Sequence, residues 1–315
     1  MKNETTFSPI DPSLFTPARK DDNKERITRP VIGYWTDVFR RLRQNKLAMV
    51  GLITIILLLI MAFVGPTIVG FDYSTQDYAR QNMEPNSINL FGTDELGRDL
   101  FTRVCYGIRY SLLIGILAAA MDFVVGVTYG GVAGMASARV DNIMMRIAEV
   151  VYAIPYLLIV ILISVMLSNE QGASLFTLVL AMSITGWVPM AIMVRGQVLQ
   201  LRENEYVTAA RSLGADKGYI LKKHIIPNTL GPILVNITLT VPRAIFSEAT
   251  LSFMSLGLQP PQPSLGVLSN DGLGVMGIGL FYQIFFPALM ISLIMFSFNV
   301  LGDGLRDALD PRLRK

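Results

Sequence analysis

The residues in this 315-residue chain that could do chemistry are few and widely separated along the sequence. A single Cys, Cys105, excludes an internal disulfide framework and a multi-cysteine metal site. A single His, His224, excludes chemistry that needs a pair of histidines. The sequence therefore predicts no metal site.

The segment GTDELGRD, from Gly92 to Asp99, superficially matches a phosphate-binding loop. In that loop a Lys reaches the phosphates and a hydroxyl reaches magnesium, whereas Arg98 and Asp99 occupy these positions here. We interpret Asp94 with Arg98, and Asp99 with Arg103, as i,i+4 ion pairs on a short surface helix. The chain contains no other phosphate loop, so we do not expect it to hydrolyse nucleotide by itself.

The composition of the chain indicates that membrane helices hold these residues in place. Hydrophobic residues make up 52% of the chain and charged residues 16%, against about 25% charged in an ordinary soluble domain. A spanning helix needs roughly 20 apolar residues, because lipid offers the backbone amides no partner. Runs with at most one charge predict an all-α membrane protein with six spanning helices, over 47–71, 110–138, 150–169, 171–194, 225–247 and 272–302.

A further uncharged stretch, 249–270, is long enough to suggest a seventh span. Its second half contains Pro260, Pro261 and Pro263, which cannot sustain a helix exposed to lipid. We therefore expect the end of the fifth helix followed by a loop.

The basic residues indicate which loops are cytoplasmic. With the N-terminus inside, 22 of the 27 Lys and Arg residues fall in the inner segments, as expected from their accumulation in cytoplasmic loops. Both termini are therefore predicted to be cytoplasmic. The first 46 residues lack a signal-peptide pattern. Within this tail, 34–46 (YWTDVFRRLRQNK) forms either a helix in the inner lipid interface or a solvated basic flank.

Small residues recur at four-residue spacing in the second span. Small side chains on one face let helix backbones approach closely in a membrane. An Asp near mid-span marks either a functional contact or a buried group that only locks the packing. The predicted packing stripe contains Ala118, Asp122, Gly126, Gly130 and Gly134.

Polar residues form a stripe on the otherwise apolar fifth span. Asn236, Thr240, Arg243 and Ser247 lie at offsets of 0, 4, 7 and 11 residues, which places them on one helix face. We predict that this face lines a water-filled path. The alternative for Arg243 is snorkelling to the interface or pairing with Glu248.

The longest inner loop, 195–224, carries about thirty residues of helical pattern with a small-residue face at Ala209, Ala210 and Gly214. This exceeds what a connection needs, and a short helix of this kind is suited to docking in the groove of a partner. An ordinary solvated connection is the alternative.

The pattern Ala209-Ala210, Gly214 and Ile226-Pro227 resembles the EAA loop of permease subunits of bacterial ABC importers. Thr208 occupies the acidic position of that pattern, and His224 an apolar one. The segments RRLRQNKLAMVGL, FGTDELGRDLFTRVCYGIRYSL, SEATLSFMSLGLQPPQPSLG and NVLGDGLRDALDPRLRK look like the C-type permease subunit of oligopeptide and dipeptide transporters. Nickel and glutathione permeases share much of this pattern.

The resemblance implies a type I ABC importer permease fold and a non-catalytic subunit that binds no cofactor itself. The implied partners are a B-type permease, two cytoplasmic ATPase subunits that bind ATP and Mg, an extracellular peptide-binding protein, membrane lipid and the peptide substrate, with no nucleic acid. The implied coupling residues are Glu205, Tyr206, Thr208, Ala209, Ala210, Arg211, Leu213, Gly214 and Ala215.

These expectations divide the chain into five parts. They are the N-terminal tail and interfacial helix (1–46), the first span (47–71), an extracellular loop (72–109), the permease core containing the coupling loop (110–302) and the C-terminal tail (303–315).

Two other classes of protein are disfavoured. An intramembrane enzyme would need a nucleophile and a base within reach of each other, but Cys105 and His224 are predicted on opposite sides of the membrane. A transporter working alone predicts inverted repeats and paired ionisable residues, whereas the spans carry one Asp and one Arg and no repeat. We expect no catalytic residue.

Overall fold

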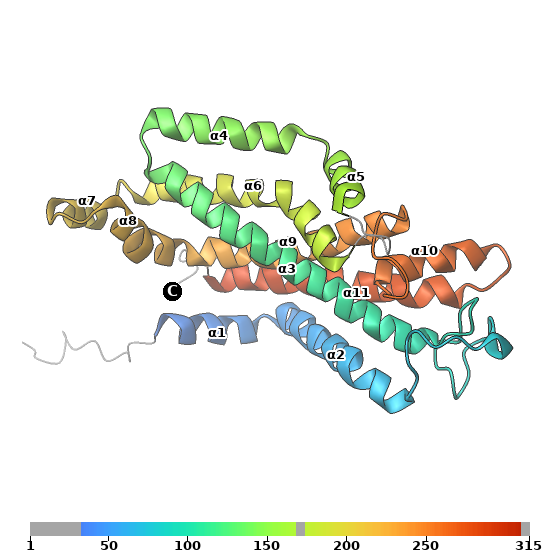
Figure 1. Cartoon of the computed structure of the whole chain (residues 1–315). Helices are drawn as coiled ribbons and strands as arrows, with labels where there is room; N and C mark the ends of the chain where they lie inside the picture. Colours follow the sequence, from blue (N-terminus) through green and yellow to red (C-terminus); the bar gives the residue numbers. More distant parts are fainter. Residues whose placement is uncertain (1–32, 168–173, 310–315) are drawn as a thin grey trace, which may run out of the picture.

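The computed structural model describes residues 33–167 and 174–309, and Figure 1 shows these ranges as a set of mostly long helices. Within them, β-structure is limited to one isolated bridge between Thr93 and Asp99. The elements are α1 (Tyr34–Gln44), α2 (Lys46–Val69), the 3-10 turn η2 (Tyr78–Arg80), α3 (Leu100–Met135), α4 (Ala138–Ala153), α5 (Tyr156–Leu167), α6 (Leu175–Leu201), α7 (Glu205–Ser212), α8 (Lys217–Ile220), the π-helical turn η3 (Leu221–Ile225), α9 (Ile226–Phe253), α10 (Leu265–Met276) and α11 (Tyr282–Leu309).

In the described residues, five helices are long and apolar enough to cross a membrane. They are α2, α3, α6, α11 and the continuous run Lys217–Phe253 that α8, η3 and α9 form. The pair α4 and α5 makes a sixth candidate if it is taken as one broken span. Six membrane-crossing segments, as the charge-free runs predict, therefore require this bent pair.

The third predicted span, 150–169, is not one straight helix. α4 and α5 are bent by 78° at the break between them. Ile154 is extended, with ψ 127°, and precedes Pro155, which disfavours the helical conformation at the residue before it. Residues 168 and 169 of the prediction lie outside the described part of the chain.

Several predicted boundaries are wrong because helices continue into expected loops. α3 begins at Leu100, within the predicted outer loop, since the side chain of Asp99 caps its first turn by accepting from the Thr102 N–H at 2.8 Å. α11 begins at Tyr282 and continues to Leu309, beyond the start of the predicted tail. The predicted loop after the prolines contains α10, which Ser264 caps.

One residue separates the first two helices. Asn45 ends α1 through backbone bonds to Arg41 and Leu42, and its side chain accepts from the Ala48 N–H at 3.1 Å to start α2. α1 packs on the end of α11, where Val38 is buried with Ala308 and Leu309. The first and last described helices therefore meet at one end of the molecule, the end that also carries α7 (Figure 1).

α3 is the centre of the packing, and its longest contact is with α6. A Cβ on Gly126 would lie 2.6 Å from Met190 Cβ, and one on Gly134 would lie 2.7 Å from Val198 Cβ. A Cβ on Gly130 would overlap the backbone carbonyl of Ala191. The small-residue stripe thus lies against a helix of the same chain, as close backbone packing between membrane helices requires.

Candidate functional site

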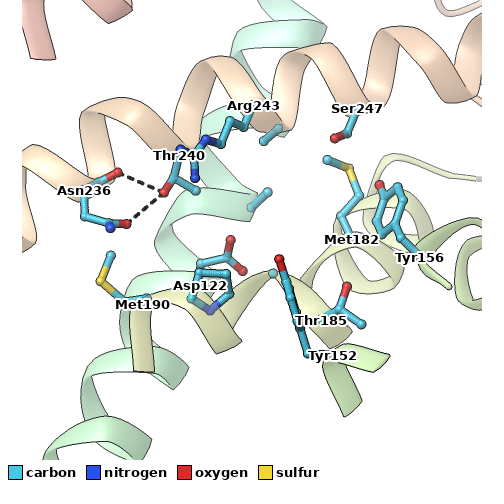
Figure 2. A pocket seen from close by; sticks show the side chains of 14 residues that line it. Asp122, Tyr152, Tyr156, Met182, Thr185, Met190, Asn236, Thr240, Arg243 and Ser247 are labelled. Atoms are coloured by element: carbon cyan, nitrogen blue, oxygen red, sulfur yellow. Dashed lines mark hydrogen bonds between the residues drawn. The ribbon is translucent and has the colours of Figure 1, made fainter. Parts of the chain in front are cut away.

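A cavity of about 280 Å³ lies between α3, the α4–α5 bend, α6 and α9 (Figure 2). All four residues of the polar stripe predicted on the fifth span line it, and so does Asp122. The full lining is Ala118, Asp122, Tyr152, Tyr156, Met182, Thr185, Gly186, Pro189, Met190, Asn236, Thr240, Arg243, Ala244 and Ser247.

The polar stripe is held in place by the helix that carries it. Thr240 donates from its hydroxyl to the Asn236 carbonyl at 2.9 Å and lies 3.3 Å from the Asn236 side-chain oxygen, as Figure 2 shows. These local bonds fix the Thr240 hydroxyl, and the Asn236 side chain lines the cavity beside it. The stripe therefore presents a hydroxyl, an amide and a guanidinium to the same space.

Asp122 lines the cavity, whereas the glycines of its predicted stripe pack against α6. Its residue is 7% exposed, and its Oδ1 atom has no hydrogen-bond partner among the described residues. A Cβ on Gly186 of α6 would lie 2.5 Å from that oxygen, so only glycine leaves room for the carboxyl. In the described residues Asp122 bonds no neighbouring hydroxyl or backbone group, as the packing interpretation would require, and its side chain lines the cavity.

Arg243 does not form an ion pair with Glu248, so the predicted pairing of these two residues is wrong. Glu248 is fully buried and accepts hydrogen bonds from Ser111 at 3.1 Å and from Ser252 at 2.6 Å. Arg243 is exposed at the cavity, and in the described part of the chain no acidic side chain forms an ion pair with it. Its positive charge is therefore available to the cavity.

The cavity also contains residues that the sequence reasoning missed. Tyr152 and Tyr156 come from the two sides of the α4–α5 bend, and Thr185 and Gly186 come from α6. Pro155 and Pro189, each within an apolar run, were the available signals for irregular backbone at this depth.

α4 is attached to the rest of the molecule by an ion pair that the sequence reasoning also missed. Arg195 of α6 binds both carboxyl oxygens of Asp141, with Nε–Oδ1 at 2.5 Å and Nη2–Oδ2 at 2.6 Å. The Tyr129 hydroxyl donates to the Met144 carbonyl at 2.7 Å. Bidentate guanidinium–carboxylate pairs fix orientation as well as distance, so α4 has a defined position along α6.

The predicted coupling residues form α7 and its C-terminal turn. Gly214 has φ +89°, the Gly214 N–H bonds the Arg211 carbonyl at 3.0 Å, and the Ala215 N–H bonds the Ala210 carbonyl at 3.1 Å. This pair of bonds is the Schellman motif, in which glycine adopts the left-handed conformation that ends a helix. Asp216 then caps α8 by accepting from the Gly218 N–H at 3.0 Å.

α7 is anchored on one side and open on the other. Val207 is fully buried in an apolar cluster that includes Val198 of α6 and Ile220 of α8, whereas Leu213 is 89% exposed. A surface groove of about 670 Å³ follows this segment. It is lined by Tyr206, Ala209, Ala210, Leu213, Gly214, Ala215, Asp216, Tyr219 and His224.

Three of the predicted coupling residues do not line the groove. Glu205, Thr208 and Arg211 are exposed on other faces of α7. His224, at an apolar position of the family pattern, packs edge-on against Tyr219 with ring centroids 5.7 Å apart.

The segment that superficially matches a phosphate loop is a buried turn and not a surface helix. Asp94 pairs with Arg98 at 2.7 Å, as expected. Arg103, however, pairs with Asp94 and lies 3.6 Å from Asp271, while Asp99 caps α3 and accepts from Asn89 at 2.8 Å. The expected Asp99–Arg103 pair is wrong because the helix begins after Asp99.

The described residues contain no group of three His, Cys, Asp or Glu side chains that could hold a metal ion. Cys105 is buried between α3 and α2, where a Cβ on Gly65 would lie 2.8 Å from its sulfur.

Family comparisons cover most of the chain. Residues 126–315 match the model of the binding-protein-dependent transport system inner membrane component. Residues 33–85 match the N-terminal TM domain of oligopeptide transport permease C.

Curated relatives match over nearly the full length. The dipeptide transport system permease protein DppC of Bacillus subtilis is 51% identical over 94% of this chain and 91% of its own. The oligopeptide transport system permease protein OppC of the same organism is 48% identical over 97% of this chain and 99% of its own. The glutathione transport system permease protein GsiD of Pectobacterium atrosepticum is 36% identical over 89% of this chain and 92% of its own.

Among solved structures, a chain of the MetNI methionine ABC transporter in an inward-facing conformation matches with a TM-score of 0.51 at 19% identity, over 65% of this chain and 94% of that one. This likeness shows a shared fold, the type I ABC importer permease fold. Together with the apolar helices, these matches show that the chain belongs to the family of binding-protein-dependent transport system inner membrane components, as a multi-pass permease of the bacterial cell membrane.

Proposed function

We propose that the chain is the C-type permease subunit of an ATP-driven importer for dipeptides or oligopeptides. Its relatives at 51% and 48% identity are named for these two cargoes, which supports peptide as the cargo class. The cavity with its polar stripe forms half of the translocation path, and a B-type permease encloses the other half.

The observation that carries the proposal is the placement of α7. A short helix with an exposed, small-residue groove projects at one end of the bundle, and the turn over 213–216 joins it to the continuous run of α8, η3 and α9, whose polar residues line the cavity (Figure 1). Because this turn is only four residues long and hydrogen-bonded at both ends, a displacement of α7 reaches the wall of the path through α8 and α9.

The driving energy comes from partners in this proposal. Shifting a two-state equilibrium from 1:99 to 99:1 takes about 5.5 kcal/mol of differential binding. Two cytoplasmic ATPase subunits, with ATP and Mg, supply it by binding α7, and an extracellular binding protein delivers the peptide. This orientation puts both termini and α7 in the cytoplasm, in agreement with the distribution of Lys and Arg.

The test is uptake of labelled peptide by cells that carry the complete transporter. Ala209→Trp fills the groove beside α7, and we expect it to abolish ATP-driven uptake while the assembled permease stays in the membrane. Thr128→Val, on an exposed face of α3, is the matched control. Normal uptake by the Ala209 variant would refute the coupling role.

Glutathione is the second candidate cargo, because a glutathione permease is 36% identical over 89% of the chain. Competition of unlabelled glutathione against labelled peptide in the same uptake assay separates the two. Uptake of glutathione in preference to peptide would replace the first candidate. The catalytic step of the complex belongs to the ATPase partners in either case, and this chain acts as a non-catalytic subunit.

A further inference from the structure

The cavity combines two opposite charges that do not pair with each other. Asp122 enters it from α3 and Arg243 from α9, and Figure 2 shows both side chains directed into the same space. In the described residues, neither forms an ion pair. A carboxyl and a guanidinium that share a cavity without contact leave room for a ligand that carries complementary charges at separate points.

The carboxyl of Asp122 lines the cavity without a hydrogen-bond donor from the described residues, and its Oδ1 atom lies against Gly186. The residue is only 7% exposed, and Oδ1 has no hydrogen-bond partner in the part of the chain that the structure describes. A buried polar atom without a partner is costly, and an acidic side chain at membrane depth is costlier still. Gly186 leaves space for the Asp122 carboxyl, since a Cβ at position 186 would lie 2.5 Å from Oδ1.

The surroundings of Asp122 specify the kind of donor. The adjacent wall supplies the Thr185 and Thr240 hydroxyls, the Asn236 amide and the guanidinium of Arg243, but no second acidic side chain. A divalent cation prefers several oxygen ligands that include more than one carboxylate. An ammonium group needs only one carboxylate and a few neutral acceptors, which is the set present here.

We propose that this cavity is a binding site for the amino-terminal end of a peptide in transit, with Asp122 binding the α-ammonium group and Arg243 facing the backbone carbonyls or terminal carboxylate. This rests on the proposed function, of which it specifies the recognition chemistry. The volume of about 280 Å³ lies just below the roughly 300–1,000 Å³ of small-molecule sites, which suits a short peptide or the end of a longer one. In this proposal the cavity binds the terminal groups and the backbone of the peptide and makes no selective contact with its side chains.

The test measures equilibrium binding to the intact permease–ATPase complex in lipid nanodiscs without the extracellular receptor, because the receptor would impose its own selection. The probes are labelled trialanine and N-acetyl-trialanine, which differ in the ammonium group. We expect the wild-type complex to bind trialanine at least about tenfold more tightly than its acetylated form. Asp122→Asn should reduce this preference to within twofold, and Asp122→Glu should retain part of it.

Two further variants distinguish a loss of peptide recognition from a loss of folding. Thr128→Val, on the same helix but facing away from the cavity, should leave the preference unchanged. Arg243→Gln should lower the preference for trialanine over its C-terminal amide and leave the effect of acetylation in place. Elution of each variant as the assembled complex confirms that it folds.

The outcomes are distinguishable from failure of the proposed function. If the wild-type complex shows no saturable binding, or if Asp122→Asn keeps the full preference for the free amino terminus, the recognition role is overturned. If receptor-dependent uptake of trialanine into proteoliposomes is still seen, the proposed function stands without it. Absence of that uptake overturns the proposed function itself.

Discussion

Glycine serves two different purposes in two regions of this molecule. Along the seam between α3 and α6, Gly130 is needed for space, because the backbone of Ala191 occupies the volume that a Cβ would take. At the end of α7, a Cβ added to Gly214 would meet no heavy atom within 4 Å, but the φ of +89° at this position suits glycine. The seam requires a residue without a side chain at Gly130, and the end of α7 requires a residue that adopts a positive φ at Gly214.

The two regions therefore respond to substitution in different ways. The seam is a continuous contact between helices of one chain, so an error there affects assembly of the bundle. The end of α7 is a local turn at the surface, so an error there changes the direction of one short helix. Four experiments test this difference, from the largest expected change in the free energy of unfolding to the smallest.

Gly130→Leu should give the largest loss. The side chain would be forced into the Ala191 backbone, and we expect destabilisation of roughly 3 kcal/mol or more and little folded protein in the membrane. Thermal unfolding of the purified permease measures it. Gly196→Leu is the control, because position 196 of α6 has no atom near the added Cβ. Equal losses in both variants would contradict the role of the seam.

Asp141→Ala should have the next largest effect, since it leaves the Arg195 guanidinium without its bidentate partner. Arg195 is 28% exposed, so we expect a loss of about 2 kcal/mol, less than for a fully buried pair. Thermal unfolding measures the loss, and faster protease cleavage within α4 would localise it. Glu149→Ala removes the exposed Arg146–Glu149 pair and should change stability by less than about 0.5 kcal/mol.

Gly214→Ala should cost about 1 kcal/mol, because alanine is strained in the left-handed conformation. We expect a modest shift in thermal unfolding but a larger loss of peptide uptake, since the direction of α7 changes. Gly218→Ala, at the second residue of α8 and without a positive φ, places a Cβ 3.1 Å from the capping oxygen of Asp216, so we expect a small change in stability and none in uptake. A Gly214 variant with full uptake would show that the turn does not matter for coupling.

Leu213→Ser should leave stability within about 0.5 kcal/mol of the original, because the side chain is 89% exposed. If α7 docks in a partner, the same substitution should lower ATP-driven uptake by removing an apolar contact. Uptake per assembled complex is the measurement. Unchanged uptake would place Leu213 outside the docking surface.

The sequence was sufficient to predict most helices, and the reason is physical. Charge-free runs of about 20 residues have few alternatives in lipid, so α2 and α6 could be located to within several residues. The predicted span 272–302 instead includes the end of α10 and starts well before α11. The bend at Ile154 and Pro155 was not predicted, because a count of charges does not register where a proline interrupts the backbone hydrogen bonds. α10 was missed because its 12 residues follow three prolines and are shorter than a span.

The candidate site was predictable only along single helices. The spacing of Asn236, Thr240, Arg243 and Ser247 was enough to place them on one face. That Asp122 shares their cavity, and that Tyr152 and Thr185 complete it, depends on how α3, α4 and α6 pack. The wrong pairing of Asp99 with Arg103 has the same origin, since the i,i+4 rule applies only within a helix and Asp99 precedes one.

The single residue between α1 and α2 has a mechanical consequence. Asn45 ends α1 with its backbone N–H and begins α2 with its side chain, so the angle between the two helices is fixed at this one residue. α1 also packs on the end of α11, and a Cβ on Gly304 of α11 would overlap Ala48 of α2. Both helices that Asn45 joins are therefore in contact with α11. α2 and α11, the first and last membrane helices in the sequence, are thereby held together as one unit.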